Sequence, residues 1–303
     1  MPSISDQPDT IERRRADGFA YDPIFDVELA RRALAEDVGR GDLTSDATIP
    51  AGARAHGRII AKADGVVAGL PMAALVLRLL DLNTHVVLTA HDGDHVRPGQ
   101  RLAVVEGNAR ALLTAERTAL NFLGRLSGIA TLTARCVAAT VGTSARIVDT
   151  RKTTPGLRAL EKYAVRMGGA VNHRSGLDDG ILIKDNHIAA VGSVGVAVTL
   201  ARAHASHLIK VEVECENEAQ VLEALEAGAD AILLDNMPED AMRAAVALIR
   251  ERNPRVVIEA SSNIGPDPQR LATVAATGVD LISLGALTHS APVFDVSLEF
   301  DAD

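Results

Sequence analysis

The stretch AILLDNMPEDAMRAAVALIRERNPRVVIEAS, residues 231–261, contains a short aliphatic run, an Ala-rich helical segment and a second aliphatic run. This order predicts a strand, a helix and a second strand parallel to the first. Pro238 stands at the opening turn of the predicted helix, where proline is well tolerated. The stretch therefore indicates an α/β protein.

The same alternation of aliphatic runs and helical segments continues over the chain from Ala145 onward. The runs that predict strands are ARIVDT, GILIKD, LIKVEVE, AILLDN, VVIEAS and LISLGA. A complete (β/α)8 barrel has eight strands, so either two strands escape the pattern or the barrel is incomplete. From Phe25 to about Leu126 predicted strands and helices follow in mixed order, which predicts a separate domain that contains both.

Length and composition exclude several classes of protein for this chain. The 303 residues suffice for a barrel and a smaller domain, and the formal net charge of -9 argues against a nucleic-acid partner. Cys136 and Cys215 belong to no CxxC or Cys/His cluster, so we expect buried thiols in a reducing compartment. Without an apolar run long enough to cross a bilayer, we expect a cytoplasmic protein with a loose arm over residues 1–24 and no membrane partner.

The segment from residue 150 to residue 174 is cationic although the chain as a whole is acidic. It contains six Lys or Arg residues and one Glu. Arg151 and Lys152 follow a predicted strand and precede a Pro-Gly turn, and His173 and Arg174 lie in a loop flanked by glycines. Since a guanidinium binds two oxygens of one carboxylate or phosphate, these four residues predict an anion site.

Other cations are predicted to lie on the surface. Arg158, Lys162 and Arg166 are spaced four residues apart, with Glu161 among them, which is typical of the solvated face of a helix. Arg117 stands beside a leucine stripe on a long predicted helix, so periodicity alone also makes it a surface residue.

Several predicted strands end in charged residues, and the carboxyl ends of barrel strands meet at one mouth. Lys184 there could form a Schiff base or act as a point charge for an anion, and the surrounding cations favour the second role. Glu214 and Asp235 could bind Mg²⁺ through water, hold ribose hydroxyls, or form salt bridges with those cations. These alternatives remain open from residue type alone.

The last two predicted strands end in EASSNIG and SLGALTHS, whose Ser261, Asn263 and glycines could surround a phosphate. Gly265 and Gly285 would allow close approach of the backbone. A different signal, HDGDHVRPGQRLAVVEG, is similar to the turn of biotinyl and lipoyl carrier domains. It contains no lysine, so we interpret it as local β-turn architecture.

Five motifs together resemble the quinolinate phosphoribosyltransferase family, also called nicotinate-nucleotide pyrophosphorylase (carboxylating). They are ERTALNFLGRLSGIAT, DTRKTTPGLRALEKYAVRMGGAVNHRSGLDDGILIKDNH, VEVE, ILLDNM and GVDLISLGALTHS. The likeness begins near Glu36 and reaches the last predicted strand. It implies an N-terminal α/β sandwich domain over 25–126, an incomplete (open) α/β barrel of parallel strands over 127–289, and a C-terminal segment, 290–303, that packs on the N-terminal domain.

The resemblance also implies a reaction and roles for its residues. Quinolinate and 5-phosphoribosyl 1-pyrophosphate would give nicotinate mononucleotide, pyrophosphate and CO2 with Mg²⁺, in de novo NAD biosynthesis. The residues implied to bind quinolinate are Arg117, Arg151, His173, Arg174 and Lys184, with Arg117 donated across a homodimer that could assemble further. Those implied to act on the phosphoribosyl substrate are Lys152, Glu214, Asp235, Ser261, Ser262, Asn263, Gly285 and His289, with Lys152, Glu214 and Asp235 catalytic and the two acids at Mg²⁺. Thr150 is also expected to bind substrate.

One residue departs from the family pattern, because Ser262 stands where the family usually has glycine. A serine can still donate to a phosphate, so we expect activity to survive. The alternatives are a paralogous phosphoribosyltransferase for another base, such as nicotinate or the base of a molybdate-transport-associated relative, and a non-catalytic anion-binding module. A non-catalytic anion-binding module would give Glu214 and Asp235 no role.

Overall fold

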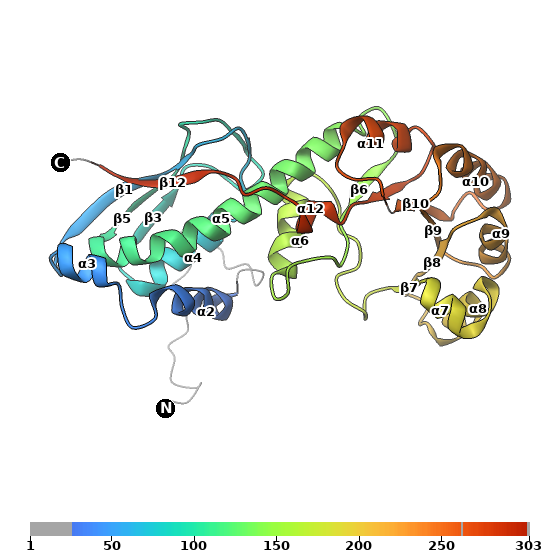
Figure 1. The fold of residues 1–303 in the computed structure, drawn as a ribbon, viewed down its shortest axis with the longest axis horizontal. Coiled ribbons are helices and arrows are strands. Elements are labelled where there is room, and N and C mark those ends of the chain that lie inside the picture. The colour runs from blue at the N-terminus through green and yellow to red at the C-terminus, as the bar shows by residue number, and fades with distance from the viewer. Residues whose placement is uncertain (1–25, 262, 302–303) are drawn as a thin grey trace.

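The computed structural model describes residues 26–261 and 263–301. The arm expected over 1–24 and Ser262 lie outside the described residues. The molecule is elongated, with one lobe built around an antiparallel sheet and the other around a parallel sheet (Figure 1). The long helix α5 (Ala109–Ala138) runs from the first lobe into the second.

The first lobe contains a four-stranded sheet in the order β12-β1-β5-β3, with antiparallel neighbours. Its strands are β1 (Arg54–Ala61), β3 (His85–Leu88), β5 (Arg101–Asn108) and β12 (Val296–Phe300). The helices beside it are α2 (Val27–Val38), α3 (Leu43–Thr48), α4 (Leu70–Leu80) and α5. A short ribbon, β2 (Gly65–Val66) with β4 (His95–Val96), contains part of the carrier-like stretch, which forms local β structure.

The second lobe contains a six-stranded parallel sheet in the order β6-β11-β10-β9-β8-β7. The strands are β6 (Arg146–Val148), β7 (Ile181–Ile183), β8 (Val211–Cys215), β9 (Ala231–Asp235), β10 (Val257–Ser261) and β11 (Leu281–Ser283). The prediction of six strands is confirmed. Because β6 and β7 are consecutive in the chain yet lie at opposite edges, the barrel is open between them, and the only described pairing on that side of β6 is a single bridge from Val148 to Val171.

The helices of the second lobe lie outside the curved sheet or beside α5 where the lobes meet (Figure 1). They are α6 (Arg158–Met167), α7 (Asp185–Val191), α8 (Val194–His204), α9 (Glu218–Glu226), α10 (Glu239–Arg252), α11 (Pro268–Ala275) and the short α12 (Ala286–His289). Local sequence sets several of their starts: the Asn217 side chain accepts from the Gln220 N–H, and the Asp267 side chain accepts from the Arg270 N–H. Of the described helices, none is sufficiently long and apolar to span a membrane.

The two lobes share structural elements. The expected domain boundary at 126 falls inside α5, which is continuous from Ala109 to Ala138. The C-terminal segment crosses this helix where glycines permit close approach, since a Cβ at Gly128 would overlap the Pro292 carbonyl. It then pairs with β1 as strand β12. Both lobes are therefore joined by two connections, α5 and the segment that returns to β12.

Candidate active site

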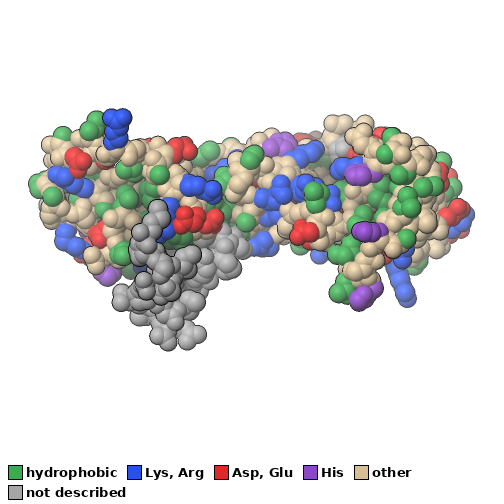
Figure 2. Space-filling view, turned by 90° about the horizontal axis from the view of Figure 1, so that it is seen from below, with side chains coloured by type: hydrophobic (Ala, Val, Ile, Leu, Met, Phe, Trp, Pro, Cys, Tyr) green, Lys and Arg blue, Asp and Glu red, His purple; other side chains and the backbone are tan. Residues whose placement is uncertain are grey.

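The carboxyl ends of the parallel strands enclose a cavity of about 320 Å³. Its lining residues are Thr150, Arg151, Lys152, His173, Arg174, Leu182, Lys184, Glu214, Leu233, Asp235, Glu259, Ser261 and Ser283. Nine residues that the sequence predicts for the site are among them, although they come from separate loops and strand ends. Lys and Arg side chains also gather near the middle of the face drawn in Figure 2, where the two lobes meet.

Two arginines of the cavity lie close enough for their positive charges to interact. Burial lowers the pKa of the Arg174 guanidinium, and the charge of Arg151 lowers it further. The Nε atom of Arg151 is buried and has no hydrogen-bond partner among the described residues. Arg174 donates from Nη1 to the Gly180 carbonyl at 2.9 Å. Crowded guanidinium groups with an unused donor are typical of a site that binds an anion.

Lys152 is held between the end of β6 and the start of α12. Its backbone N–H donates to the Thr150 hydroxyl at 3.0 Å, and its carbonyl accepts from the Thr288 hydroxyl at 2.8 Å. A Cβ at Gly285 would lie only 2.9 Å from Lys152 Cδ and 3.1 Å from His289 Nε2. A larger residue here would crowd both side chains, so glycine leaves room for Lys152 and His289.

The prediction that Lys162 lies on a solvated helix face is wrong. Its side chain is buried and its Nζ lies 2.6 Å from Asp149 Oδ1. The same ammonium donates to the His173 carbonyl at 2.9 Å, and Asp149 Oδ1 accepts from the His173 N–H at 2.8 Å. Arg158 also turns inward, donating to the Thr153 hydroxyl at 3.0 Å. The four-residue spacing correctly predicts that these residues share one helix face. On that face, however, Lys162 holds the loop that contains His173.

Lys184, Glu214 and Asp235 form a second group at the mouth. Lys184 Nζ lies 3.0 Å from Glu214 Oε2. Burial raises the pKa of the Glu214 carboxyl, and the neighbouring Asp235 adds to this effect, whereas Lys184 opposes it. Two adjacent carboxylates supply the hard oxygen ligands that Mg²⁺ prefers, so their chemistry fits a divalent cation.

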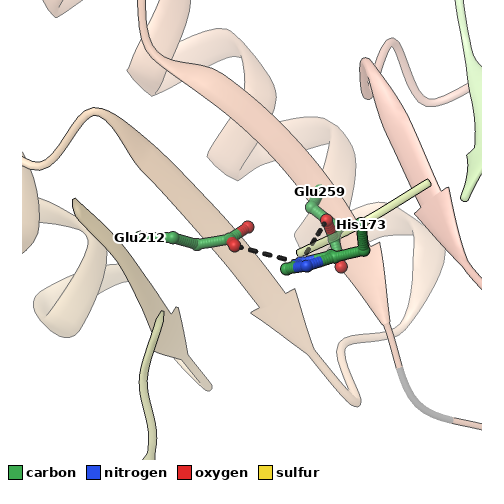
Figure 3. A group of neighbouring side chains, drawn as sticks. All are labelled: His173, Glu212 and Glu259. Atoms are coloured by element: carbon green, nitrogen blue, oxygen red, sulfur yellow. Dashed lines mark ion pairs between the residues drawn. The ribbon is translucent and has the colours of Figure 1, made fainter. Parts of the chain in front are cut away.

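A third group was missed as a site by sequence reasoning. The His173 ring lies between Glu212 of β8 and Glu259 of β10 (Figure 3). Its Nε2 atom is 3.2 Å from Glu212 Oε2 and 3.5 Å from Glu259 Oε2. Its Nδ1 atom accepts from the Arg174 N–H at 2.7 Å. One sequence signal could have revealed Glu212. Side chains alternate along a strand, so Glu212 and Glu214, which stand two residues apart in VEVE, point to the same side.

Five predicted residues do not line this cavity. Arg117 is exposed on α5 and lines a different hollow together with Asp42 and Leu43. Gly285 and His289 lie beside Lys152, at the edge of the site. Asn263 has a left-handed backbone with φ of 54° and donates to the Asn236 side chain at 2.8 Å. The fifth, Ser262, is outside the described residues.

The fold and the site together define an anion-binding enzyme of the open α/β-barrel type with an N-terminal sheet domain. The chain belongs to the quinolinate phosphoribosyltransferase family: the profile for "Quinolinate phosphoribosyl transferase, C-terminal domain" matches residues 129–299, and the profile for the N-terminal domain matches residues 42–127. The family prediction and the open-barrel prediction are both confirmed.

Similar proteins agree with this assignment. The chain is 47% identical over 266 residues to a probable nicotinate-nucleotide pyrophosphorylase [carboxylating] of Synechocystis sp., covering 88% of this chain and 89% of that one. It is 48% identical over 279 residues to the corresponding protein of Mycobacterium leprae, covering 90% and 96%. The crystal structure of NadC from Streptococcus pyogenes superposes with a TM-score of 0.87 at 42% identity, covering 93% and 99%. The chain is therefore a phosphoribosyltransferase.

Proposed function

We propose that this enzyme transfers the phosphoribosyl group of 5-phosphoribosyl 1-pyrophosphate to quinolinate with decarboxylation, giving nicotinate mononucleotide, pyrophosphate and CO2 for NAD biosynthesis. The observation that carries this proposal is the meeting of Arg151, Arg174 and Lys184 with Glu214 and Asp235 in one cavity. Cations suit a dicarboxylate, and carboxylates suit a ribose with its metal ion.

Quinolinate is assigned to the cationic wall of the cavity. Arg151 and Arg174 can each direct two N–H groups at one carboxylate, and Lys184 adds a third positive charge. His173 stands between this wall and the buried acids, because its Nδ1 atom accepts from the Arg174 N–H and its Nε2 atom faces Glu212. Nicotinate, which lacks the second carboxylate, would leave part of this wall unpaired.

The phosphoribosyl substrate is assigned to the acids at the mouth, next to Lys184. Glu214 and Asp235 would hold ribose hydroxyls and Mg²⁺, which supplies positive charge to the departing pyrophosphate when bound. Lys152 would contact the pyrophosphate. The residues proposed at the 5-phosphate are Thr150, Ser261, Ser262, Asn263, Gly285 and His289.

Bond formation at the ribose then follows from charge placement. Loss of pyrophosphate leaves positive charge at the ribose carbon, which Glu214 and Asp235 stabilise because they lie at the same mouth. The pyridine nitrogen, held in place by its carboxylates, attacks that carbon. The ring becomes cationic, and this charge makes loss of the adjacent 2-carboxylate possible.

We further propose a homodimer in which Arg117 of each chain completes the cavity of its partner. Arg117 is exposed and lies outside its own chain's cavity, which supports this arrangement. A cytoplasmic location is proposed because Cys136 and Cys215 are both buried and unbridged, as expected of a reducing compartment.

The test is release of labelled CO2 from carboxyl-labelled quinolinate, measured with and without the phosphoribosyl substrate and Mg²⁺. Release should require both additions and should be lost in Lys152→Ala. A parallel assay follows pyrophosphate with nicotinate in place of quinolinate. Pyrophosphate release with nicotinate, and no CO2 from quinolinate, would instead identify a paralogous activity.

A further inference from the structure

The proposed reaction requires a proton inside the cavity. When the bond from ring carbon C2 to its carboxylate breaks, the electron pair stays on C2, CO2 leaves, and C2 must take up one proton. The guanidinium groups of Arg151 and Arg174 are poor acids, because arginine keeps its proton at any ordinary pH. Lys184 Nζ lies 3.0 Å from Glu214 Oε2, so its ammonium group is engaged with an acid that is assigned to the ribose.

We propose that Glu259 is the acid that protonates C2 as CO2 leaves, an inference that rests on the proposed function. Glu259 is one of the residues that line the cavity, together with the proposed quinolinate-binding cations. Donation of its proton to the electron pair on C2 leaves a glutamate carboxylate and a neutral C–H bond. The carboxylate regains a proton from solvent after the product has left, so the cycle consumes one proton for each CO2 released.

The geometry around Glu259 favours its protonated form. Its side chain is 1% exposed, and neither carboxyl oxygen accepts a hydrogen bond of good geometry from the residues that the structure describes, although His173 and the Ser283 hydroxyl lie nearby. A second carboxylate, Glu212, competes for the single nearby imidazole donor and lies closer to it, at 3.2 Å against 3.5 Å. A buried carboxylate without a donor is costly, and the protonated form removes that cost.

The groups that face Glu259 from neighbouring elements agree with this state. Burial raises the pKa of Glu259 to about 7, the charge of Glu212 adds to the shift, and His173, the Ser283 hydroxyl and Lys184 only partly oppose it. The same three groups would stabilise the carboxylate formed on donation. The site thus favours the acid before the reaction and tolerates the anion after it.

A metal ion is the competing interpretation of this cluster. One ligand atom from each of His173, Glu212 and Glu259 can be chosen so that all lie within 4.8 Å of one another, and no ion is present. However, His173 Nδ1 accepts the Arg174 N–H, which places the proton of the neutral ring on Nε2. Nε2 is the atom that faces both carboxylates, so it donates a hydrogen bond and is not free to bind a metal.

The test is a single-turnover experiment with Glu259→Gln, in which glutamine mimics the shape of the protonated acid. With enzyme in excess, pyrophosphate formation and CO2 release from carboxyl-labelled quinolinate are followed together. In the wild type both should have one time course. In Glu259→Gln we expect pyrophosphate formation within about threefold of wild type, CO2 release slowed about 100-fold, and accumulation of the undecarboxylated quinolinate nucleotide.

The control is Arg243→Ala, at an exposed position on α10 outside the cavity, in which both rates should match wild type. Equal slowing of both rates in Glu259→Gln, or no slowing of either, would overturn the proposal. So would a stoichiometric divalent ion in purified wild type that is lost in Glu259→Gln. Failure of the proposed function looks different, because wild type itself would then form no pyrophosphate from quinolinate.

Discussion

The ammonium of Lys162 lies 2.6 Å from the carboxylate of Asp149, and the two side chains are only 4% and 0% exposed. This buried pair joins α6 to the end of β6. It also contacts both the N–H and the carbonyl of His173. The pair therefore positions the loop that presents His173 and Arg174 to the cavity.

Removal of one partner should be costly for stability. Lys162→Met leaves the Asp149 charge buried and unpaired, so we expect the free energy of unfolding to fall by about 3–5 kcal/mol. The exposed cation of the same helix, Arg166, is the control, and Arg166→Ala should change it by less than about 1 kcal/mol. Urea denaturation measures both, and similar losses in the two variants would contradict the buried role of Lys162.

Arg151 should act on quinolinate rather than on the phosphoribosyl substrate. Loss of a charge-assisted pair is worth about 1.5–3 kcal/mol, so Arg151→Ala should weaken quinolinate binding about 10- to 100-fold and change phosphoribosyl binding little. Isothermal titration with each substrate checks this. Arg243→Ala, at an exposed position on α10, is the control, and equal weakening of both substrates by Arg151→Ala would refute the assignment.

The proposed exchange of Arg117 can be tested by mixing two inactive variants. A mixed dimer of Arg117→Ala and Arg151→Ala has one site with both arginines intact and one with neither. Random mixing should then restore about a quarter of wild-type activity, because half of the dimers are mixed and half of their sites are complete. Activity measured before and after mixing decides the point; no recovery after verified subunit exchange would place Arg117 in its own chain's site.

Glu259 should also make stability depend on pH. Its folded pKa of about 7 exceeds its ordinary value of 4.5, so between these values the folded protein retains a proton that the unfolded chain has lost. Wild type should therefore lose stability relative to Glu259→Gln as pH rises from 4.5 to 7, by up to about 1.4 kcal/mol per pH unit. Paired urea melts measure the difference, and a difference independent of pH would show that Glu259 is ionised throughout.

Short aliphatic runs could be recognised as strands because buried parallel strands are apolar on both faces. Their polar last residues could be placed at one mouth because parallel strands share a direction. Lys162 could not be placed this way, since its spacing identifies a helix face without saying what covers it. Pairing of β12 with β1 was equally hidden, because it joins residues such as Gly57 and Phe300 that are far apart in the sequence.

The acids of the cavity show a different limit. Glu214, Asp235 and Glu259 stand at or near the ends of predicted strands, whereas only the structure shows that Glu212 and Glu259 meet at His173. For Arg117, the periodicity of the surrounding helix correctly predicts an exposed position. Only the family resemblance suggests what this residue contacts.

Strand β12 has a consequence for how the protein is made on the ribosome. The sheet of the first lobe receives its last strand from residues 296–300, whereas its other strands are complete by residue 108. While the barrel is being synthesised, one edge of strand β1 has no partner strand, and such edges pair readily with other chains. Loss of β12 alone would spare every residue of the cavity and still leave this edge of the sheet open to aggregation.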